Sequence, residues 1–260
     1  MRKFHLVMPM GGRGTRFFDD GFIIPKPLIQ LQNKPFFFWA ANSLYTYENV
    51  QDITFVVLKE HIEEFNIMNE IKKYFPKANI VVLEHVLNGA VLTCLEGIKN
   101  IDDDLPIVFN DCDHAFFSAK FEEFLKDESQ DVDGALLTFT SNEDKFSYVK
   151  YNSNHEIVGT VEKEVVSNDA ICGAYYFKNK QTFDKYTQRY LHNCSYKEFF
   201  ISGVYNEMCR DSKSIVICPT DLHLSFGVPQ EYNEVKDSPH FKDIYNRVAD
   251  KYSLTINETC

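Results

Sequence analysis

A glycine-rich loop directly after an apolar run constrains this chain more than any other feature of its sequence. Residues 4–10 are almost continuously apolar, which is typical of a strand buried on both faces of a sheet, and Gly11-Gly12-Arg13-Gly14-Thr15-Arg16 follows at once. Glycine lets the backbone take positive φ and approach a ligand closely, so successive N–H groups can converge on phosphate oxygens. The spacing matches neither a Walker loop nor G-x-G-x-x-G. We predict an anion-binding loop, with a tight surface turn as the alternative.

Strand-type and helix-type segments alternate after this loop. Between His61 and Phe75 the apolar residues recur every three or four positions, which is a helix period, and Pro76 ends the pattern. The first half is predicted to contain strands at 4–10, 53–58, 79–83 and 105–109, and helices at 36–45, at 61–75 and from Gly89 onward. This spacing favours a parallel, doubly wound sheet, in which ligands bind beyond the carboxyl ends of the strands.

The second half consists of shorter segments. Strands, some of them in hairpins, are expected at 135–139, 148–151, 156–161, 171–177 and 214–218, and helices at 181–191, 197–209 and in patterns up to about residue 252. No repeat and no Pro/Gly/Ser linker divides the sequence. We therefore predict a single α/β domain over residues 1–260, built on a Rossmann-like, doubly wound mixed sheet with a small β-hairpin portion.

The balance of charge limits the partners. The chain has 27 Lys and Arg against 38 Asp and Glu, a formal net charge of −11, which disfavours nonspecific binding to nucleic acid or to an anionic membrane. Residues 1–34 are the exception, because six basic side chains stand there against two acidic ones. A polyanionic ligand is therefore expected near the amino terminus, and neither nucleic acid nor membrane is expected as a partner.

The cysteines and the apolar runs indicate a compartment. Seven cysteines without any C-x-x-C pair are typical of the reducing cytosol. The opening apolar run is shorter than a signal-peptide core, and no stretch approaches the roughly 20 apolar residues of a membrane helix. We expect a soluble, unprocessed, cytoplasmic protein. The aromatic run at 36–39 is expected to be a buried helix start, with a homo-oligomer surface as the alternative.

Two further motifs carry charge at fixed positions. Prolines on both sides of Lys26 restrict its backbone, which is unusual for a solvated lysine, although a rigid surface turn is the alternative. Asp111 and Asp113 follow the strand at 105–109, and hard oxygen ligands beside a phosphate site suit Mg²⁺; a polar cap at the strand end is the alternative. The pairs Glu162-Lys163 and Lys197-Glu198 are more often solvated charges than sites.

Taken in order, these motifs resemble the bacterial nucleotidylyltransferase family, which activates sugar phosphates and related phosphorylated metabolites. The resemblance rests on the first strand, GGRGTR, PKPL, a strand ending in D-x-D, V-E-K and a short strand with Gly173. It runs from Phe4 to about Pro229, nearly the whole chain. The variant of the motifs in this chain is similar to that of members from capsule and surface-polysaccharide pathways. It implies a nucleotide-binding half at 1–115 and, at 116–260, an acceptor-binding half with the C-terminal helices.

The resemblance also implies roles for individual residues. It implies that the NTP is held by Met10, Gly11, Gly12, Arg13, Gly14, Arg16, Lys26, Asn88, Gly89 and Ala90. The catalytic residues would be Arg16 near the leaving pyrophosphate, Lys26 at the α-phosphate and Asp111. Asp111 and Asp113 would hold Mg²⁺, the expected cofactor, and Lys163, Glu162 and Lys197 would bind the phosphorylated acceptor.

Two departures from the family pattern matter. Many relatives carry a second metal-binding aspartate where this chain has Ser225, which puts a second metal site in doubt and leaves Asp221 as the first other candidate. The opening Met-Pro-Met-Gly-Gly also differs from the common Leu-Ala-Gly-Gly, so base and acceptor do not follow by analogy.

The function expected is therefore transfer of NMP from an NTP, with CTP preferred, to a sugar phosphate or another phosphorylated metabolite, releasing pyrophosphate. Its setting would be the synthesis of capsule or surface-polysaccharide precursors. A nucleotide-sugar glycosyltransferase of the GT-A type is one alternative, because such enzymes also combine an N-terminal α/β sheet with D-x-D. A non-catalytic nucleotide-binding module is the other.

Overall fold

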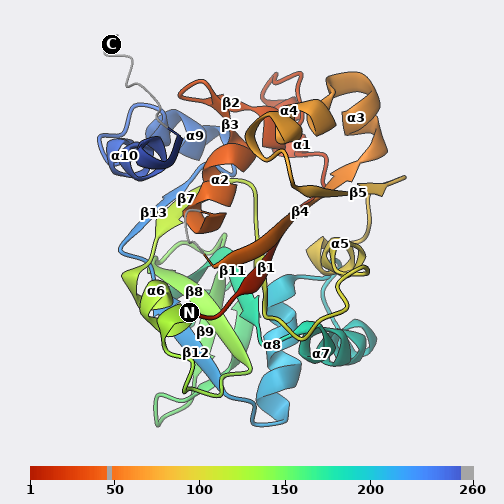
Figure 1. Ribbon diagram of the computed structural model, residues 1–260. Helices are drawn as coiled ribbons and strands as arrows, with labels where there is room; N and C mark the ends of the chain where they lie inside the picture. Colours follow the sequence, from red (N-terminus) through yellow and green to blue (C-terminus); the bar gives the residue numbers. More distant parts are fainter. Residues whose placement is uncertain (46–48, 253–260) are drawn as a thin grey trace.

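The computed structural model describes residues 1–45 and 49–252, and a nine-stranded sheet runs through them (Figure 1). Its first half is parallel, in the spatial order β5-β4-β1-β6. The strands of this half are β1 (Phe4–Met10), β4 (Val50–Leu58), β5 (Asn79–Leu83) and β6 (Ile107–Asn110). The alternating pattern of the sequence is thereby confirmed, and the carboxyl ends of β1 and β6 lie side by side.

The second half makes the sheet mixed. β11 pairs antiparallel with β6, and the hairpin of β9 and β10 continues from β11, while β8 pairs with β11 and with β12. These strands are β8 (Gly134–Thr140), β9 (Ser147–Tyr151), β10 (Ile157–Glu162), β11 (Asp169–Phe177) and β12 (Ile215–Pro219). The predicted doubly wound mixed sheet is therefore confirmed.

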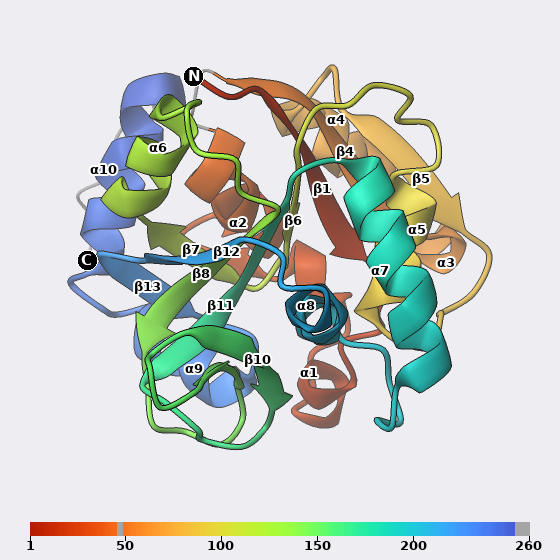
Figure 2. The same ribbon diagram turned by 90° about the horizontal axis from the view of Figure 1, so that it is seen from below.

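Helices cover both faces of this sheet. Those of the first half are α1 (Thr15–Asp19), α2 (Phe36–Tyr45), α3 (Lys59–Phe65), α4 (Ile67–Tyr74) and α5 (Ala90–Gly97). Those of the second are α6 (Ala119–Lys126), α7 (Lys180–Asn193), α8 (Ile201–Arg210), α9 (Pro229–Val235) and α10 (Phe241–Tyr252). One apolar core joins the sheet to α2, α4, α6 and α10, and another joins it to α5, α7 and α8. In Figure 2, α2, α6 and α10 accordingly lie on the left, and α5 and α7 on the right.

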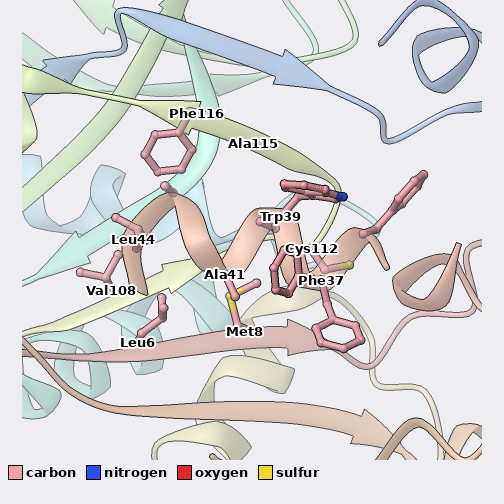
Figure 3. Packing of buried hydrophobic residues seen from close by; sticks show 14 of the residues in the cluster. Leu6, Met8, Phe37, Trp39, Ala41, Leu44, Val108, Cys112, Ala115 and Phe116 are labelled. Carbon is pink, nitrogen blue, oxygen red and sulfur yellow. The ribbon is translucent and has the colours of Figure 1, made fainter. Parts of the chain in front are cut away.

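Helix α2 occupies the centre of the first core. Phe36, Phe37, Phe38 and Trp39 are all fully buried, and Trp39 donates its Nε1–H to the Leu31 carbonyl at 2.7 Å. Figure 3 shows α2 lying across β1, with Ala41 close to Met8. The aromatic run is therefore a buried helix start, as expected, and not an exposed surface.

Two helices differ from the predicted pattern. The helix predicted at 61–75 is two helices, because Asn66 takes a left-handed conformation (φ 55°) that ends α3 and begins α4. Asparagine tolerates this conformation better than other side chains with a Cβ. The helix predicted at 197–209 begins only at Ile201, since the N–H of Phe199 donates to the Asn88 carbonyl at 3.4 Å and that of Phe200 to the Tyr190 hydroxyl at 3.1 Å.

A two-stranded ribbon was not predicted at all. β7 (His114–Phe117) pairs antiparallel with β13 (Leu222–Ser225), joining segments from the two halves of the chain. A second small pair, β2 (Gln30–Leu31) with β3 (Lys34–Pro35), precedes α2. The ribbon brings the segment after β13 close to the turn that follows β6, where the N–H of Phe226 donates to the Asp113 carbonyl at 2.9 Å.

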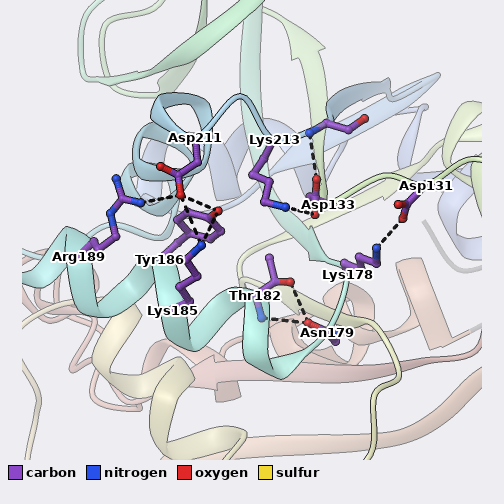
Figure 4. Close-up of polar contacts among 11 residues, drawn as sticks. Asp131, Asp133, Lys178, Asn179, Thr182, Lys185, Tyr186, Arg189, Asp211 and Lys213 are labelled. Atoms are coloured by element: carbon purple, nitrogen blue, oxygen red, sulfur yellow. Dashed lines mark hydrogen bonds and ion pairs between the residues drawn. The ribbon is translucent and has the colours of Figure 1, made fainter.

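The face of α7 turned away from the sheet is held by polar contacts (Figure 4). Asn179 caps the helix through the Thr182 N–H at 2.9 Å, and Arg189 pairs with Asp211 at 2.7 Å. Across residues 1–45 and 49–252, none of the helices combines the length and the apolar character needed to cross a bilayer. The six cysteines in these ranges are free, and Cys260 lies outside the described residues.

At the amino end of β1, a buried histidine links an aspartate of β4 to one in the loop before β6. Nδ1 of His5 lies 2.9 Å from Asp52, and its Nε2 lies 2.9 Å from Asp103. Burial alone would lower the pKa of His5, but the hydrogen bonds and charges of the two aspartates outweigh it and raise the pKa. Only protonated imidazole can donate to both carboxylates.

We therefore expect this contact to stabilise the fold most below pH 6.5, the ordinary histidine pKa, and to weaken as the pH rises through the raised pKa of the folded protein. Asp103→Asn should lower the free energy of unfolding by about 1 kcal/mol at pH 6, and by less at pH 9, with the value reduced because Asp103 is half exposed. Urea unfolding at the two pH values measures the difference. An equal loss at both would contradict the assignment.

Candidate active site

A cavity of about 640 Å³ opens at the carboxyl ends of β1 and β6. Twelve of its lining residues are those that the sequence motifs single out: Met10, Gly11, Gly12, Arg13, Gly14, Arg16, Lys26, Asn88, Gly89, Ala90, Asp111 and Asp113. The folded chain thus brings four features to one place: the glycine-rich loop, the proline-flanked Lys26, the start of α5 and the turn with Asp111 and Asp113. This is the edge at which ligands of doubly wound sheets bind.

The glycine-rich loop is shaped by its contact with Lys26. Gly14 has φ 67°, and a Cβ at this position would lie 2.7 Å from Cβ of Lys26. Only glycine fits both the positive φ and the close approach. The side chain of Arg13 leaves the loop to pair with Glu60 at 3.2 Å, and both groups are exposed. The loop therefore lies against Lys26, and its residues line the cavity.

Lys26 begins the 3₁₀ turn Lys26–Leu28, between two prolines as the sequence suggested. Its Nζ lies 2.7 Å from Oδ2 of Asp113, 87 positions away in the chain. Burial acts to lower the pKa of Lys26, but the charge of Asp113 and its hydrogen bond raise it, so the ammonium stays charged. A permanent positive charge thus stands at the floor of the cavity.

The acidic turn contains two carboxylates in unlike states. Burial, and then the charge of Asp113, raise the pKa of Asp111 to about 7. Burial also acts to raise the pKa of Asp113, but the charge and hydrogen bond of Lys26 outweigh it and lower the pKa. Gly173 lies so close that a Cβ there would be 2.8 Å from Oδ2 of Asp111. Asp111 is thus enclosed, and Lys26 compensates only part of the paired negative charge.

This donor set fits a hard cation. The two carboxylates are two residues apart, and one lysine balances only one of their negative charges. A divalent ion would balance the charge that remains. No group of three or more His, Cys, Asp or Glu side chains with metal-binding geometry occurs in the part of the chain that the structure describes. The protein would therefore supply few ligands, as is usual for Mg²⁺, which retains most of its water.

The three residues assigned to the acceptor lie outside the cavity lining. Lys163 is exposed, with Nζ 5.3 Å from the centre of the Phe200 ring. Glu162 accepts hydrogen bonds from the hydroxyls of Ser147 and Ser202, and burial raises its pKa. Lys197 is exposed and precedes α8 rather than opening it.

Glu198, next to Lys197, lines the cavity instead. It was missed because a Lys-Glu pair in the sequence is typical of a solvated face, and the backbone bonds of Phe199 with Asn88 and Val91, which bring this segment to the site, are tertiary contacts. Its charge also contributes to the raised pKa of Glu162. The wall nearest to the helix start is therefore acidic, not basic.

At Ser225, where many relatives have an aspartate, the serine hydroxyl is hydrogen-bonded to the carboxylate of Glu231. This hydroxyl donates to Oε2 of Glu231 at 2.7 Å, and the N–H of Gly227, a cavity residue, donates to the same atom at 2.9 Å. Lys145 pairs with Oε1 of Glu231 at 2.8 Å. Asp221, the other candidate, accepts from the Ala119 N–H at 2.7 Å and does not line the cavity. Glu231 was not predicted, because no local motif marks it.

A family model and several solved structures match the chain. The family model described as nucleotidyl transferase matches residues 6–232. The chain resembles the nucleoside-diphosphate-sugar pyrophosphorylase from Vibrio cholerae RC9, with a TM-score of 0.76 and 23% identity over 88% of this chain and 98% of that one. It also resembles the inositol-1-phosphate CTP transferase from T. maritima, with a TM-score of 0.73 and 12% identity over 96% and 97% of the two chains.

A UDP-glucose pyrophosphorylase complexed with UDP-glucose has a TM-score of 0.71 and 16% identity, over 93% of this chain and all of that one. No curated protein sequence matches the chain. Identities this low show the shared fold, whereas the family model spans most of the sequence and agrees with the motifs around the cavity. It favours nucleotidyl transfer over a glycosyltransferase or a non-catalytic module. The chain belongs to the nucleotidyl transferase family and is a nucleotidyltransferase enzyme.

Proposed function

We propose that the enzyme transfers a nucleotidyl group from an NTP to a phosphate-bearing small molecule and releases pyrophosphate. The supporting observation is the convergence of the glycine-rich loop, Lys26 and the Asp111–Asp113 turn on one cavity of about 640 Å³. An oxygen of the acceptor phosphate attacks the α-phosphorus, and the bond from that phosphorus to the bridging β-phosphate oxygen breaks. The attacking oxygen is already anionic, so no base and no covalent enzyme intermediate are needed.

The residues then act by charge and position. Backbone N–H groups of Gly11, Gly12 and Gly14, with Arg16 and with Arg13 released from Glu60, bind the β- and γ-phosphates that leave. Lys26 neutralises the α-phosphate as charge develops on it. The segment at 88–90 and Met10 hold the nucleoside. This arrangement places two polyanions in line while lowering their repulsion.

Mg²⁺ is the proposed cofactor, and Asp111 and Asp113 would hold it. When bound, it would supply positive charge to the triphosphate oxygens. Asp113 would then give up its contact with Lys26 in order to hold the ion, and Nζ of Lys26 would become available to the substrate. Ser225 does not replace a carboxylate here, since its hydroxyl is bonded to Glu231.

The finer assignments rest on sequence features. CTP is the proposed nucleotide because of the opening Met-Pro-Met-Gly-Gly, and capsule or surface-polysaccharide synthesis is the proposed setting. A cytoplasmic location is proposed from the free cysteines. A single domain over residues 1–260 stays a prediction, supported by the sheet that both halves share. A homo-oligomer also stays a prediction.

Pyrophosphate release tests the function directly. The purified protein is incubated with Mg²⁺, each NTP and a panel of sugar 1-phosphates, polyol phosphates and phosphorylated amino alcohols. We expect release that needs NTP and acceptor together and stops with EDTA. Transfer from a nucleotide-sugar without pyrophosphate would instead indicate a glycosyltransferase.

The acceptor assignment has its own prediction. Lys163 is the proposed acceptor-phosphate ligand, with Glu162 next to it. Both lie outside the cavity lining, so the acceptor would have to extend past this lining to meet them. Lys163→Ala should raise the acceptor KM about tenfold, the value of one charge-assisted contact, and change the NTP KM less than twofold. Lys178→Ala, which loses only the exposed pair with Asp131 (Figure 4), is the control. A raised NTP KM with an unchanged acceptor KM would remove Lys163 from this role; Lys197→Ala tests the third residue similarly.

A further inference from the structure

The turn that carries Asp111 and Asp113 is tied together at its base. Asn110 is the last residue of β6 and His114 the first of β7, and Nε2 of His114 lies 3.0 Å from Oδ1 of Asn110. Nδ2 of Asn110 donates to the Ala40 carbonyl in α2 at 2.9 Å. Both side chains are buried. The five-residue turn is therefore closed by its two end residues and anchored to the helix beneath it.

These contacts fix the position of one hydrogen. Because the amide nitrogen of Asn110 donates to Ala40, the atom facing His114 is a carbonyl oxygen, which can only accept. Nε2 of His114 must therefore carry the hydrogen. Nδ1 of the same ring has no hydrogen-bond partner within residues 1–45 and 49–252. The bond to Asn110 thus determines how the ring is oriented.

The hydrogen bond across the turn matters because the two aspartates of the turn repel each other. Asp111 and Asp113 repel each other in a partly buried setting, and Lys26 contacts Asp113. The backbone bonds of the turn reach outward to other segments: the Asp111 N–H donates to the Gly173 carbonyl at 2.9 Å, on the side of β11, and the Asp113 carbonyl accepts from the Phe226 N–H at 2.9 Å. Without the side-chain bond across the base, the two carboxylates could move apart while both neighbouring strands stayed intact.

We propose that Asn110 and His114 are positioning residues, whose hydrogen bond holds the Asp111 and Asp113 carboxylates at a fixed spacing from each other and from Lys26. Neither residue touches the cavity, so both act through the turn. The inference rests on the proposed function of that cavity. It adds two residues that no motif marks and that lie behind the site rather than in it.

A matched pair of substitutions separates the bond from the volume of the ring. The amide nitrogen of glutamine can stand near Nε2 of histidine, whereas that of asparagine reaches only the position of Nδ1. We expect His114→Asn to raise the Mg²⁺ concentration for half-maximal turnover about tenfold or more, the usual effect of removing a residue that orients metal ligands. His114→Gln should stay within about threefold of the parent, and the acceptor KM should not move in either.

A second histidine of the same ribbon is the control. His223 stands 5.5 Å from His114, ring centre to ring centre, and packs 4.0 Å from Phe139, with no bond to Asn110. His223→Asn is expected to lower the melting temperature while leaving the Mg²⁺ half-saturation within twofold. Should His114→Asn not fold, His114→Phe, which keeps a ring without the donor, takes its place.

Two measurements do not depend on turnover. ¹⁵N spectra of the parent's labelled histidines should show a hydrogen on Nε2 of His114, and electron paramagnetic resonance should show Mn²⁺ bound with NTP about tenfold more weakly by His114→Asn. A hydrogen on Nδ1, equal Mn²⁺ affinity, or a His114→Gln variant as impaired as His114→Asn would overturn the proposal. If the parent releases no pyrophosphate with any acceptor, the proposed function fails, and these two measurements still decide the role of the pair.

Discussion

Lys26→Met lowers turnover by about 10²-fold or more, with a smaller change in the NTP KM, because it removes a charge that acts mainly on the transition state. The folded chain prepares this charge in advance. Pro25 and Pro27 restrict the backbone around it, Gly14 packs against its Cβ, and Asp113 keeps the ammonium charged. The backbone position of Lys26 is then set before the substrate binds and only its contact with Asp113 has to be exchanged, which favours a large electrostatic effect.

Lys34→Met is the matched control. Lys34 also precedes a proline and is also partly buried, but it lies over the rings of Phe38 and Tyr74 and does not line the cavity. Steady-state kinetics with both substrates, and circular dichroism to verify the fold, give the comparison. If Lys26→Met keeps its turnover, or if both variants lose it equally, Lys26 has no direct part in the transfer.

Asp111→Asn reduces turnover by about 10³-fold, to near the limit of detection, whereas Asp113→Asn causes a smaller loss. The two differ because Asp113 already pairs with Lys26, while Asp111 has the raised pKa of a buried carboxylate without a cationic partner of its own. Asp111 therefore gains most from a divalent ion. Stopped assays with enough enzyme to detect slow turnover measure both variants.

The same reasoning predicts weak metal binding without nucleotide. Lys26 competes for Asp113, and the described residues add no third carboxylate with metal-binding geometry, so calorimetry of the nucleotide-free protein should detect little Mg²⁺. Asp133→Asn removes the charge that pairs with Lys213 and keeps an amide oxygen for the Ser214 N–H (Figure 4), so it controls for loss of an aspartate as such. Tight Mg²⁺ binding to the free protein, or full activity of Asp111→Asn, would contradict the assignment.

Local motifs made most of the polar lining of the cavity predictable. The glycine-rich loop, Lys26 and the Asp111–Asp113 turn each signal their chemistry within a few residues, and the alternating strands and helices of the first half place them at one edge of a sheet. Two acidic residues at or beside the cavity were not predictable in this way. Glu198 enters the lining through a backbone contact between Phe199 and Asn88, and Glu231 reaches Ser225 only once β13 has paired with β7.

The errors in the fold have the same physical origin. A periodic run of apolar residues predicts a helix but not a left-handed residue inside it, so the break at Asn66 was invisible. Short strands such as β7 and β13 have too few residues to show a period, and each exists because the other is there. Tertiary pairing, rather than local preference, decides such segments.

Two glycines packed against Lys26 and Asp111 limit where the sequence of this enzyme could be changed. Gly14 against Lys26 and Gly173 against Asp111 leave no space for a methyl group, and both have positive φ. A mutant library intended to widen the range of acceptors should therefore leave positions 14 and 173 unchanged. Its diversity belongs in the two exposed segments around Lys163 and Glu198, where new side chains can project without displacing Lys26 or Asp111. If the proposed acceptor role of Lys163 holds, altered specificity could arise in these tolerant segments without a new active site.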